Sequence, residues 1–146
     1  MGAILETAEL AERLVADELG ENFAIERSRL YSLIKGEQGY TLTLASEHSD
    51  VYDLLENTDS KDIARVSDFI VVVTCGWASP ITGDPDADEQ VAPSQHPERR
   101  RVRLVVTASR DGMASVLRFQ DQPDDTVTDE GQARGTLAEA VQSLFF

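Results

Sequence analysis

Hydrophobic positions near the start of the chain recur at helical spacing. Ala8, Ala11 and Val15 fall on one side of a helix drawn over residues 4–19, and Gly20 follows as a natural helix end. We therefore predict an amphipathic helix over 4–19 that packs its apolar side against the rest of the protein.

The next two hydrophobic segments have the two-residue period of strands. Residues 29–34 and 40–45 flank a five-residue connector that contains two glycines, which suits a hairpin loop. In the second segment Tyr40, Leu42 and Leu44 alternate with threonines, a pattern typical of a half-buried strand. The two segments are predicted to form a β-hairpin.

Three shorter stretches have helical patterns. Ser49 or Asp50 can cap a short helix through its side-chain oxygen, and Thr136 with Glu139 matches a capping box before a last helix. A less regular turn lies between these two helices. The apolar positions of the three stretches are Val51, Leu54, Leu55, Ile63, Val66, Leu137, Ala140, Val141 and Leu144.

Residues 69–75 are apolar or β-branched on both alternating faces. A strand of this kind is usually central in a sheet and covered on both sides. It could instead lie at a contact between subunits, and the sequence leaves both interpretations open.

The strongest local signal is Asp111-Gly112, a dipeptide that suits a two-residue type I′ turn. Such a turn pairs Arg110 with Met113 and sets the register of the strands on either side. The predicted partners are Val106 with Leu117, Leu104 with Phe119, Val105 with Arg118 and Arg103 with Gln120. The first two pairs then share an apolar face, which we expect to pack against helices.

The remaining segments are a polar connector, an acidic stretch and an aromatic end. Residues 79–98 are rich in proline and aspartate, and a loop of this length usually binds something or is mobile. Residues 121–130 are acidic, and we expect them to be exposed. Phe145 and Phe146 are costly to leave in water, so we expect them to dock on the sheet or on a partner.

These elements combine into an α+β prediction. We expect an antiparallel sheet of about five strands with helices packed on it, in the order α-β-β-α-β-β-β-α. Nothing in the sequence divides the chain, so residues 1–146 should form a single globular domain. The element order is similar to that of Roadblock-type and other profilin-like domains and, less closely, to that of small acidic secretion chaperones. This similarity rests on no shared motif, and it implies a fold rather than a function.

Charge alters the expected partners. Thirteen Lys and Arg residues against 27 Asp and Glu residues give a net charge of −14, which repels nucleic acid and anionic lipid. We therefore expect neither a nucleic acid nor a membrane as partner. A basic protein partner or a cationic ligand would explain the acidic surface, and so would solubility alone or a salt-rich cell interior.

Three absences favour a reducing compartment. No stretch is apolar for long enough to cross a membrane, and the first residues lack the pattern of a signal peptide. The one cysteine, Cys75, has no partner for an intrachain disulfide. The expected location is the cytoplasm.

An acidic motif resembles the start of a calcium loop but does not complete it. Asp84, Asp86 and Asp88 have the required spacing, whereas Glu89 replaces the turn glycine and Gln95 replaces the last carboxylate ligand. A solvated acidic loop is the better interpretation.

The nucleophile and metal candidates are isolated residues. Cys75 with His96 could form a nucleophile and its base, and His48 with His96 could bind a metal. Neither pair belongs to a family signature. We therefore predict no catalytic residue, no metal site and no cofactor, and the sequence leans against an enzyme.

A single basic cluster stands out in the acidic chain. Strand alternation puts Arg99, Arg101 and Arg103 on one side and Arg100 on the other. The cluster could grip a phosphate or a carboxylate. Charge balance with the acidic segments nearby at 84–89 and 121–130 is the better interpretation.

Trp77 follows the doubly apolar strand and could be a binding hot spot or a large core residue. Together with the basic cluster it defines a candidate ligand-binding site. The candidate residues are Trp77, His96, Arg99, Arg101 and Arg103.

Three functions fit these features. The first is a non-enzymatic protein-interaction module, in the form of a homodimer that contacts another protein. The second is a small enzyme, or a protein that binds a ligand or anion in a pocket near Trp77, His96 and residues 99–103. The third is an acidic chaperone for a basic client, whose binding would weaken with salt.

Overall fold

The computed structural model describes most of the chain. It describes residues 3–20, 23, 26–56, 58–78, 97, 99–122, 126–130, 140, 141 and 143–145. Their elements are, in order, α1 (Ala3–Leu19), β1 (Ser28–Gly36), β2 (Gly39–His48), α2 (Val51–Glu56), α3 (Thr58–Arg65), β3 (Phe69–Ala78), β4 (Arg100–Ser109), β5 (Gly112–Phe119) and β6 (Thr126–Glu130). Within these residues, no helix is both long enough and apolar enough to cross a membrane.

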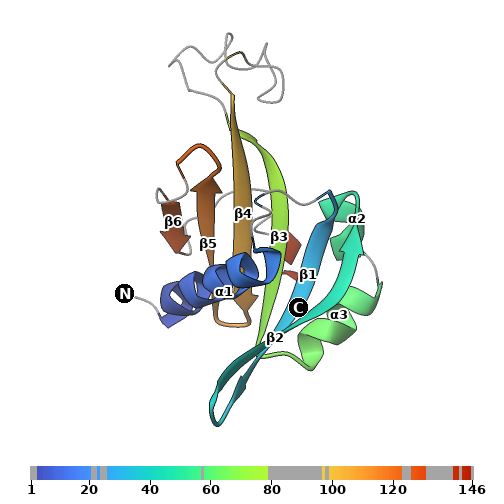
Figure 1. Ribbon diagram of the computed structural model, residues 1–146. Helices are drawn as coiled ribbons and strands as arrows, with labels where there is room; N and C mark the ends of the chain where they lie inside the picture. The colour runs from blue at the N-terminus through green and yellow to red at the C-terminus, as the bar shows by residue number, and fades with distance from the viewer. Residues whose placement is uncertain are drawn as a thin grey trace.

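The strands form one antiparallel sheet in the order β2-β1-β3-β4-β5-β6 (Figure 1). The prediction of an α+β protein with an antiparallel sheet is confirmed, but this sheet has six strands rather than five. The additional strand is β6, which pairs with β5 at one edge. The sequence did not predict this strand, but the side chains of residues 126–128 are exposed, as expected. Between β2 and β3 the chain forms two short helices, where the sequence predicted one helix and a turn.

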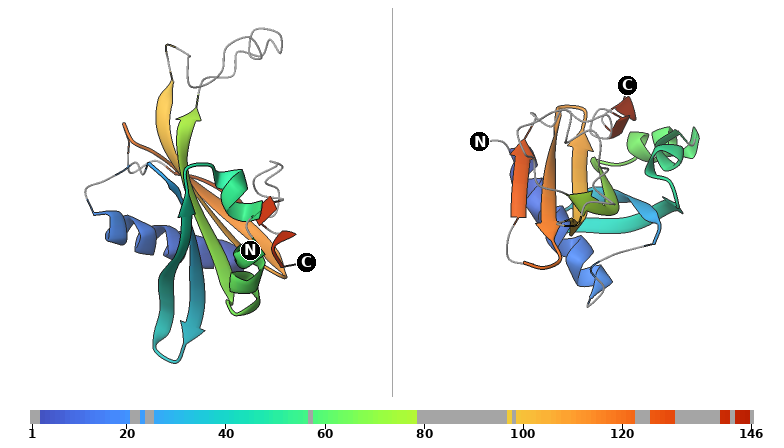
Figure 2. Two further views of the ribbon diagram at one scale, coloured as in Figure 1. Left: turned by 90° about the vertical axis from the view of Figure 1, so that its right-hand side faces the viewer. Right: turned by 90° about the horizontal axis from the view of Figure 1, so that it is seen from above.

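Helices cover both faces of the sheet, so the protein has three layers (Figure 2). On one face α1 packs Ala11, Val15 and Leu19 against side chains of β1, β3 and β4. On the other face α2 and α3 lie over the same strands, and Val141 and Leu144 join them in one buried cluster. The predicted apolar side of the first helix is thus confirmed as a packing surface.

The central position of β3 explains its doubly apolar sequence. Ile70 and Val72 belong to the cluster under α2 and α3, whereas Val71 and Val73 belong to the cluster under α1. All four side chains are 0% exposed. Burial within one chain therefore accounts for this strand without a contact between subunits.

The β4–β5 hairpin forms, but its register differs from the prediction by two residues. Ser109 pairs with Gly112, so the turn residues are Arg110 and Asp111. A type I′ turn at Asp111-Gly112 would need positive φ at both residues, and among the described residues only Gly20 and Gly39 have it. The Ser109 hydroxyl accepts a hydrogen bond from the Asp111 amide at 3.2 Å and supports the turn that forms instead.

A shift of two residues leaves every side chain on its predicted face. Leu104 now faces Leu117, Val106 faces Ser115, Val102 faces Phe119, Val105 faces Val116 and Arg103 faces Arg118. Val106 is buried, and Leu104, Leu117 and Phe119 are partly buried. The opposite face, with Val105 and Val116, is buried under α1 as well.

Some predictions concern residues outside the described part of the chain. They include the capping pair Thr136 and Glu139, nearly all of the connector 79–98, and Phe146. Phe145 is described, and it packs partly buried against the cluster under α2 and α3. This aromatic side chain therefore docks on the body of the protein, one of the two outcomes that the sequence left open.

Candidate functional site

β3 and β4 extend together beyond their neighbours and form a projecting arm (Figure 1). The pairing of β3 with β1 ends at Val73, and the pairing of β4 with β5 ends at Val102. Past these points β3 and β4 continue to pair with each other, as far as Ala78 and Arg100. We call residues 75–78 and 99–101 the β3–β4 arm.

Trp77 lies on this arm beside two arginines. The guanidinium carbons of Arg99 and Arg101 are each 5.0 Å from the centroid of its ring, a distance at which the cations are attracted to the face of the indole. Arg101 is the direct cross-strand partner of Trp77. The indole remains 39% exposed, so the structure brings three of the predicted site residues together at the surface.

Arg100 points to the other side of the arm, as strand alternation predicts. Its guanidinium lies 3.9 Å from the centroid of the Phe119 ring. It also donates hydrogen bonds from Nε and Nη2 to the two carboxyl oxygens of Asp121, at 2.9 and 2.7 Å. These hydrogen bonds hold the pKa of Asp121 below its usual value. Charge balance with the segment that follows β5 therefore explains Arg100.

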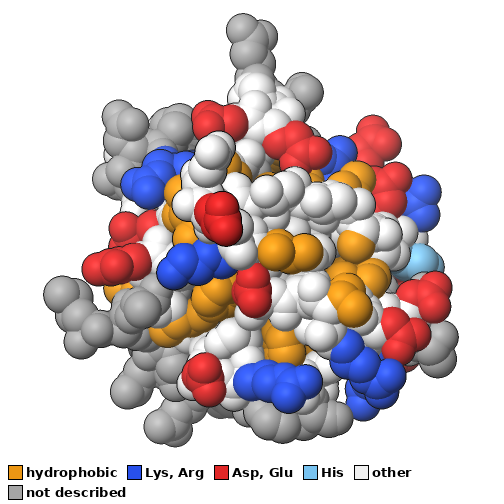
Figure 3. Space-filling view, turned by 90° about the horizontal axis from the view of Figure 1, so that it is seen from below, with side chains coloured by type: hydrophobic (Ala, Val, Ile, Leu, Met, Phe, Trp, Pro, Cys, Tyr) orange, Lys and Arg blue, Asp and Glu red, His pale blue; other side chains and the backbone are white. Residues whose placement is uncertain are grey.

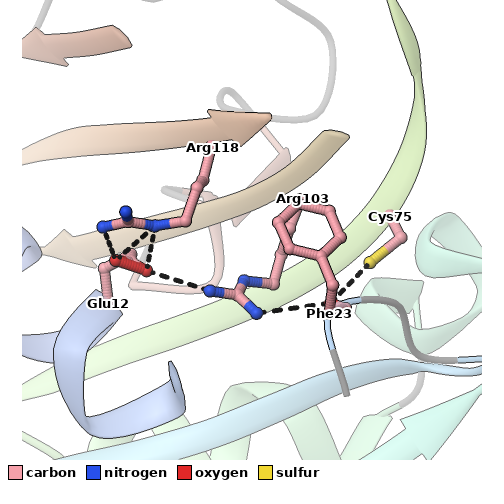
Figure 4. Close-up of polar contacts among 5 residues, drawn as sticks. All are labelled: Glu12, Phe23, Cys75, Arg103 and Arg118. Atoms are coloured by element: carbon pink, nitrogen blue, oxygen red, sulfur yellow. Dashed lines mark hydrogen bonds and ion pairs between the residues drawn. The ribbon is translucent and has the colours of Figure 1, made fainter. Parts of the chain in front are cut away.

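Arg103 has a different environment from Arg99 and Arg101. It is only 4% exposed, and its Nη2 donates a hydrogen bond at 3.2 Å to Glu12 of α1 (Figure 4). Its Nη1 donates to the Phe23 carbonyl at 3.3 Å, and its guanidinium carbon lies 4.9 Å from the centroid of the Phe23 ring. Although it shares a strand face with Arg101, Arg103 is enclosed between the sheet and α1.

Glu12 joins the first helix to two strands. Arg118 of β5 also binds its carboxylate, through Nε at 3.1 Å from Oε1 and through Nη2 (Figure 4). Glu12 is 1% exposed. A buried carboxylate is tolerated because two guanidinium groups supply both charge and hydrogen bonds. This ionic cluster has a structural role: it fixes α1 over β4 and β5.

A groove lies at the edge of the arm, where β1 begins and β3 continues. Its volume is about 350 Å³. The residues that line it are Glu26, Ser28, Ser49, Asp50, Val51, Tyr52, Thr74, Cys75 and Arg101. Arg101 therefore borders both the indole of Trp77 and this groove.

Cys75 and His48 have local partners in the structure. The Cys75 sulfur lies 4.0 Å from the carbonyl oxygen of Phe23 (Figure 4). His48 accepts a hydrogen bond from the Asp50 amide on Nδ1 at 2.9 Å, and Asp50 in turn caps α2 by accepting from the Tyr52 amide at 2.8 Å. In the part of the chain that the structure describes, no three His, Cys, Asp or Glu side chains gather where they could hold a metal ion. His96, the remaining predicted site residue, lies outside that part.

Other exposed hydrophobic side chains are dispersed. Among the residues that the structure describes, the large ones besides Trp77 are Ile34, Leu44, Tyr52, Val66 and Val127. On the face seen in Figure 3, hydrophobic side chains lie in patches that acidic and basic groups separate. Trp77 differs from the other exposed hydrophobic residues in its contact with two arginines.

No family model, curated protein or solved structure matches this chain. The similarity in element order noted above therefore gains no further support. The fold therefore describes the class of the protein: it is a three-layer α+β protein with an antiparallel sheet and a projecting β3–β4 arm.

Two features of the site could not be seen in the sequence. Glu12 and Phe23 surround Arg103 from positions 91 and 80 residues away, and no local pattern indicates such distant contacts. The second feature is that β1 covers β3 only as far as Val73, which leaves the rest of β3 without this neighbour. The limit depends on where two strands distant in the sequence meet. The apolar or β-branched run of residues 69–75, followed closely by Trp77, was the available signal for the arm.

Proposed function

We propose that this protein is a non-enzymatic protein-interaction module whose contact surface includes the β3–β4 arm. The observation that carries the proposal is the exposed indole of Trp77 in contact with Arg99 and Arg101. Trp and Arg are the residue types most enriched at binding hot spots. Their combination at the end of a projecting hairpin favours a role in contacting another protein.

The charge of the arm indicates the kind of surface it would meet. The chain has a net charge of −14, but the arm presents Arg99 and Arg101 beside Trp77, while Arg100 is paired with Asp121. A basic patch on an acidic protein orients a partner whose complementary surface is acidic, because the rest of the molecule repels it. A second copy of this chain would offer such an acidic surface, and a homodimer is therefore one form of the proposal.

Two alternatives have less support from the described residues. An anion site built on residues 99–103 would have fewer arginines available, because Arg103 is paired with Glu12 and Arg100 with Asp121. A chaperone for a basic client would use the acidic surface rather than this arm. Neither alternative explains why a large aromatic side chain is exposed among cations.

Peptide selection tests the proposal directly. A display library of random peptides is selected on the wild-type protein and then counter-selected on Trp77→Ala. The proposal expects sequences rich in acidic and apolar residues that the variant fails to retain. The matched control is Val127→Ala, which removes another exposed hydrophobic side chain, on the edge strand β6 that β5 separates from β4. Peptides that bind Trp77→Ala as well as they bind the wild type would contradict it.

Self-association is tested separately by sedimentation velocity. Wild type and Trp77→Ala are compared from micromolar to millimolar concentration. A homodimer through the arm requires dissociation in the variant at concentrations where the wild type remains associated. A wild type that stays monomeric throughout would exclude the homodimer and leave an unlike partner.

A further inference from the structure

From the open edge of β3 we infer that the arm binds an extended peptide segment as an additional strand. This inference rests on the proposed function, since it names the mode of binding and the chemistry of the partner. The binding edge consists of residues 75–78 of β3, on the side that β1 covers farther down the strand. The partner is a segment in which acidic and bulky apolar residues alternate.

The pairing pattern leaves this edge open. β1 pairs with β3 from Phe69 to Val73, and its first residue, Ser28, reaches Thr74 through a hydrogen bond between their hydroxyl groups at 2.9 Å. Beyond Thr74, β3 has β4 on one side only. Within the described part of the chain, no backbone hydrogen bond joins residues 75–78 to another segment on the open side. An unpaired strand edge is a template for main-chain hydrogen bonds to a peptide.

A groove lies at the start of this edge, at Cys75, and gives a peptide room to enter. Thr74 and Cys75 form one wall of the groove of about 350 Å³, and Asp50, Val51 and Tyr52 of the α2 start form another. β1 begins at the bottom of the same groove, at Ser28. A peptide strand laid along residues 75–78 would thus continue the position of β1 in the sheet.

Side chains of an added strand would meet two different surfaces. Positions on the α1 face would lie next to Trp77 and Arg101, which favours an acidic side chain because a guanidinium binds carboxylates well. Positions on the opposite face would lie next to Gly76, where a Cβ would meet no atom within 4 Å. That open space favours a bulky apolar side chain, and Thr74, on the same face of β3, lines the groove together with the partly exposed Tyr52. Alternation of the two types therefore follows from the two faces of the arm.

Amide exchange measured by NMR tests the geometry. The probes are short synthetic peptides with alternating acidic and bulky apolar residues, capped at both ends. Because alternate residues of a strand point their amides to the same side, binding should protect one alternate pair, either Cys75 and Trp77 or Gly76 and Ala78. The outer edges of β2 and β6 serve as internal controls. Protection at those edges instead of at residues 75–78 would overturn the inference.

Peptide N-methylation provides a second test. Methyl groups on one alternate set of peptide amides should weaken binding about tenfold or more, because they remove the main-chain donors and crowd the strand edge. Methyl groups on the other set should leave the affinity within about twofold. Equal effects of both sets would contradict strand addition.

A matched pair of glycine substitutions locates the site. Gly76→Val should lower peptide affinity about tenfold or more by filling the space that the apolar side chain would occupy. Gly112→Val at the far end of the sheet should not change it. Neither glycine has a positive φ and neither added Cβ meets an atom within 4 Å, so both variants should keep the fold, which circular dichroism checks.

The outcomes separate this inference from the function on which it rests. If the probes shift the fluorescence of Trp77, the one tryptophan of the chain, but protect no amide among residues 75–78, strand addition is wrong while the arm remains a contact surface. If Gly76→Val binds the probes as tightly as Gly112→Val, the conclusion is the same. If no probe binds at millimolar concentration, the inference fails whether or not Trp77 contributes to another interface.

Discussion

At the scale of single residues, Glu12 is the most consequential side chain in the protein. Its carboxylate is enclosed with Arg103, and Arg118 closes the cluster from a more exposed position. The arrangement places one negative and two positive charges between α1 and the sheet. Removing the carboxylate would leave Arg103 charged and buried without its ionic partner.

Glu12→Gln should therefore destabilise the protein by about 3 kcal/mol, the low end for breaking a buried ion pair. The free energy of unfolding is measured by urea titration. Glu9→Gln, an exposed position one turn earlier in the same helix, is the control and should stay within about 0.5 kcal/mol of the wild type. Equal stability of the two variants would show that Arg103 does not depend on Glu12.

The exposed pair of Arg100 and Asp121 gives a prediction about pH. Because the hydrogen bonds from Arg100 lower the pKa of Asp121 in the folded state, the pair stabilises the fold above the unfolded pKa of about 3.9. That contribution is lost as the pH falls through the lower, folded pKa. Arg100→Gln should raise the pKa of Asp121 toward the unfolded value, as followed by NMR titration of its carboxyl group. An Arg65→Gln control removes a charge elsewhere, and the same shift in both variants would contradict the local cause.

The sequence predicted which side of the strand each arginine of the cluster occupies, but not what each arginine contacts. Alternation correctly separated Arg100 from Arg99 and Arg101, because the period of a strand depends only on local backbone geometry. The burial of Arg103 could not be predicted, since it depends on Glu12 in a helix 91 residues away. Long-range contacts of this kind carry no local signature.

At the scale of elements, the β4–β5 hairpin shows where local signals mislead. The dipeptide Asp111-Gly112 favours a type I′ turn, yet the turn forms one residue earlier and Gly112 opens β5. Both registers bury the same side chains, because a shift of two residues preserves the faces. The apolar pattern therefore cannot discriminate between the two, and the Ser109 hydroxyl bond to the Asp111 amide supports the observed one.

Two glycine variants test this register. Gly112→Ala should be neutral or stabilise by about 0.4–1 kcal/mol, because its φ is not positive and the unfolded chain loses entropy. Gly39→Ala should destabilise by about 1 kcal/mol or more, because Gly39 has φ 126° in the β1–β2 turn. Thermal unfolding measures both. Destabilisation by Gly112→Ala as large as that of Gly39→Ala would indicate the Asp111-Gly112 turn after all.

β6 illustrates a different limit of sequence-based prediction. As an edge strand it pairs only with β5, and its described side chains, residues 126–128, are exposed. The hydrophobic alternation that reveals half-buried strands is consequently missing. The strand is held by backbone hydrogen bonds to β5, and these require no alternation of hydrophobic and polar side chains in the sequence.

At the scale of the whole molecule, two apolar faces of one sheet have to be covered by short helices. The sequence predicted this well, since β3 is apolar on both sides and α1 has a clear apolar stripe. Which helix covers which face was not predictable, because both faces present similar aliphatic side chains.

The net charge of −14 gives a prediction for the whole molecule. Repulsion among surface carboxylates opposes the compact state, and salt screens it, since the Debye length falls from about 30 Å at 0.01 M to about 3 Å at 1 M. The thermal midpoint should rise with sodium chloride, as differential scanning calorimetry would show. Binding of acidic peptides to the arm should weaken over the same range. A midpoint that is flat or falls with salt would contradict the dominance of repulsion.

The ion pairs of Glu12 also have a consequence for synthesis on the ribosome. The residues that complete the cluster, Arg103 and Arg118, are made 91 and 106 positions later, which takes roughly 5–20 s at the usual pace of translation. During that interval the first helix lacks β4 and β5, the two strands with which it makes most of its contacts. Docking of the helix must therefore be a late event in maturation, and a nascent chain stalled before Arg103 should remain easily cleaved by protease within α1.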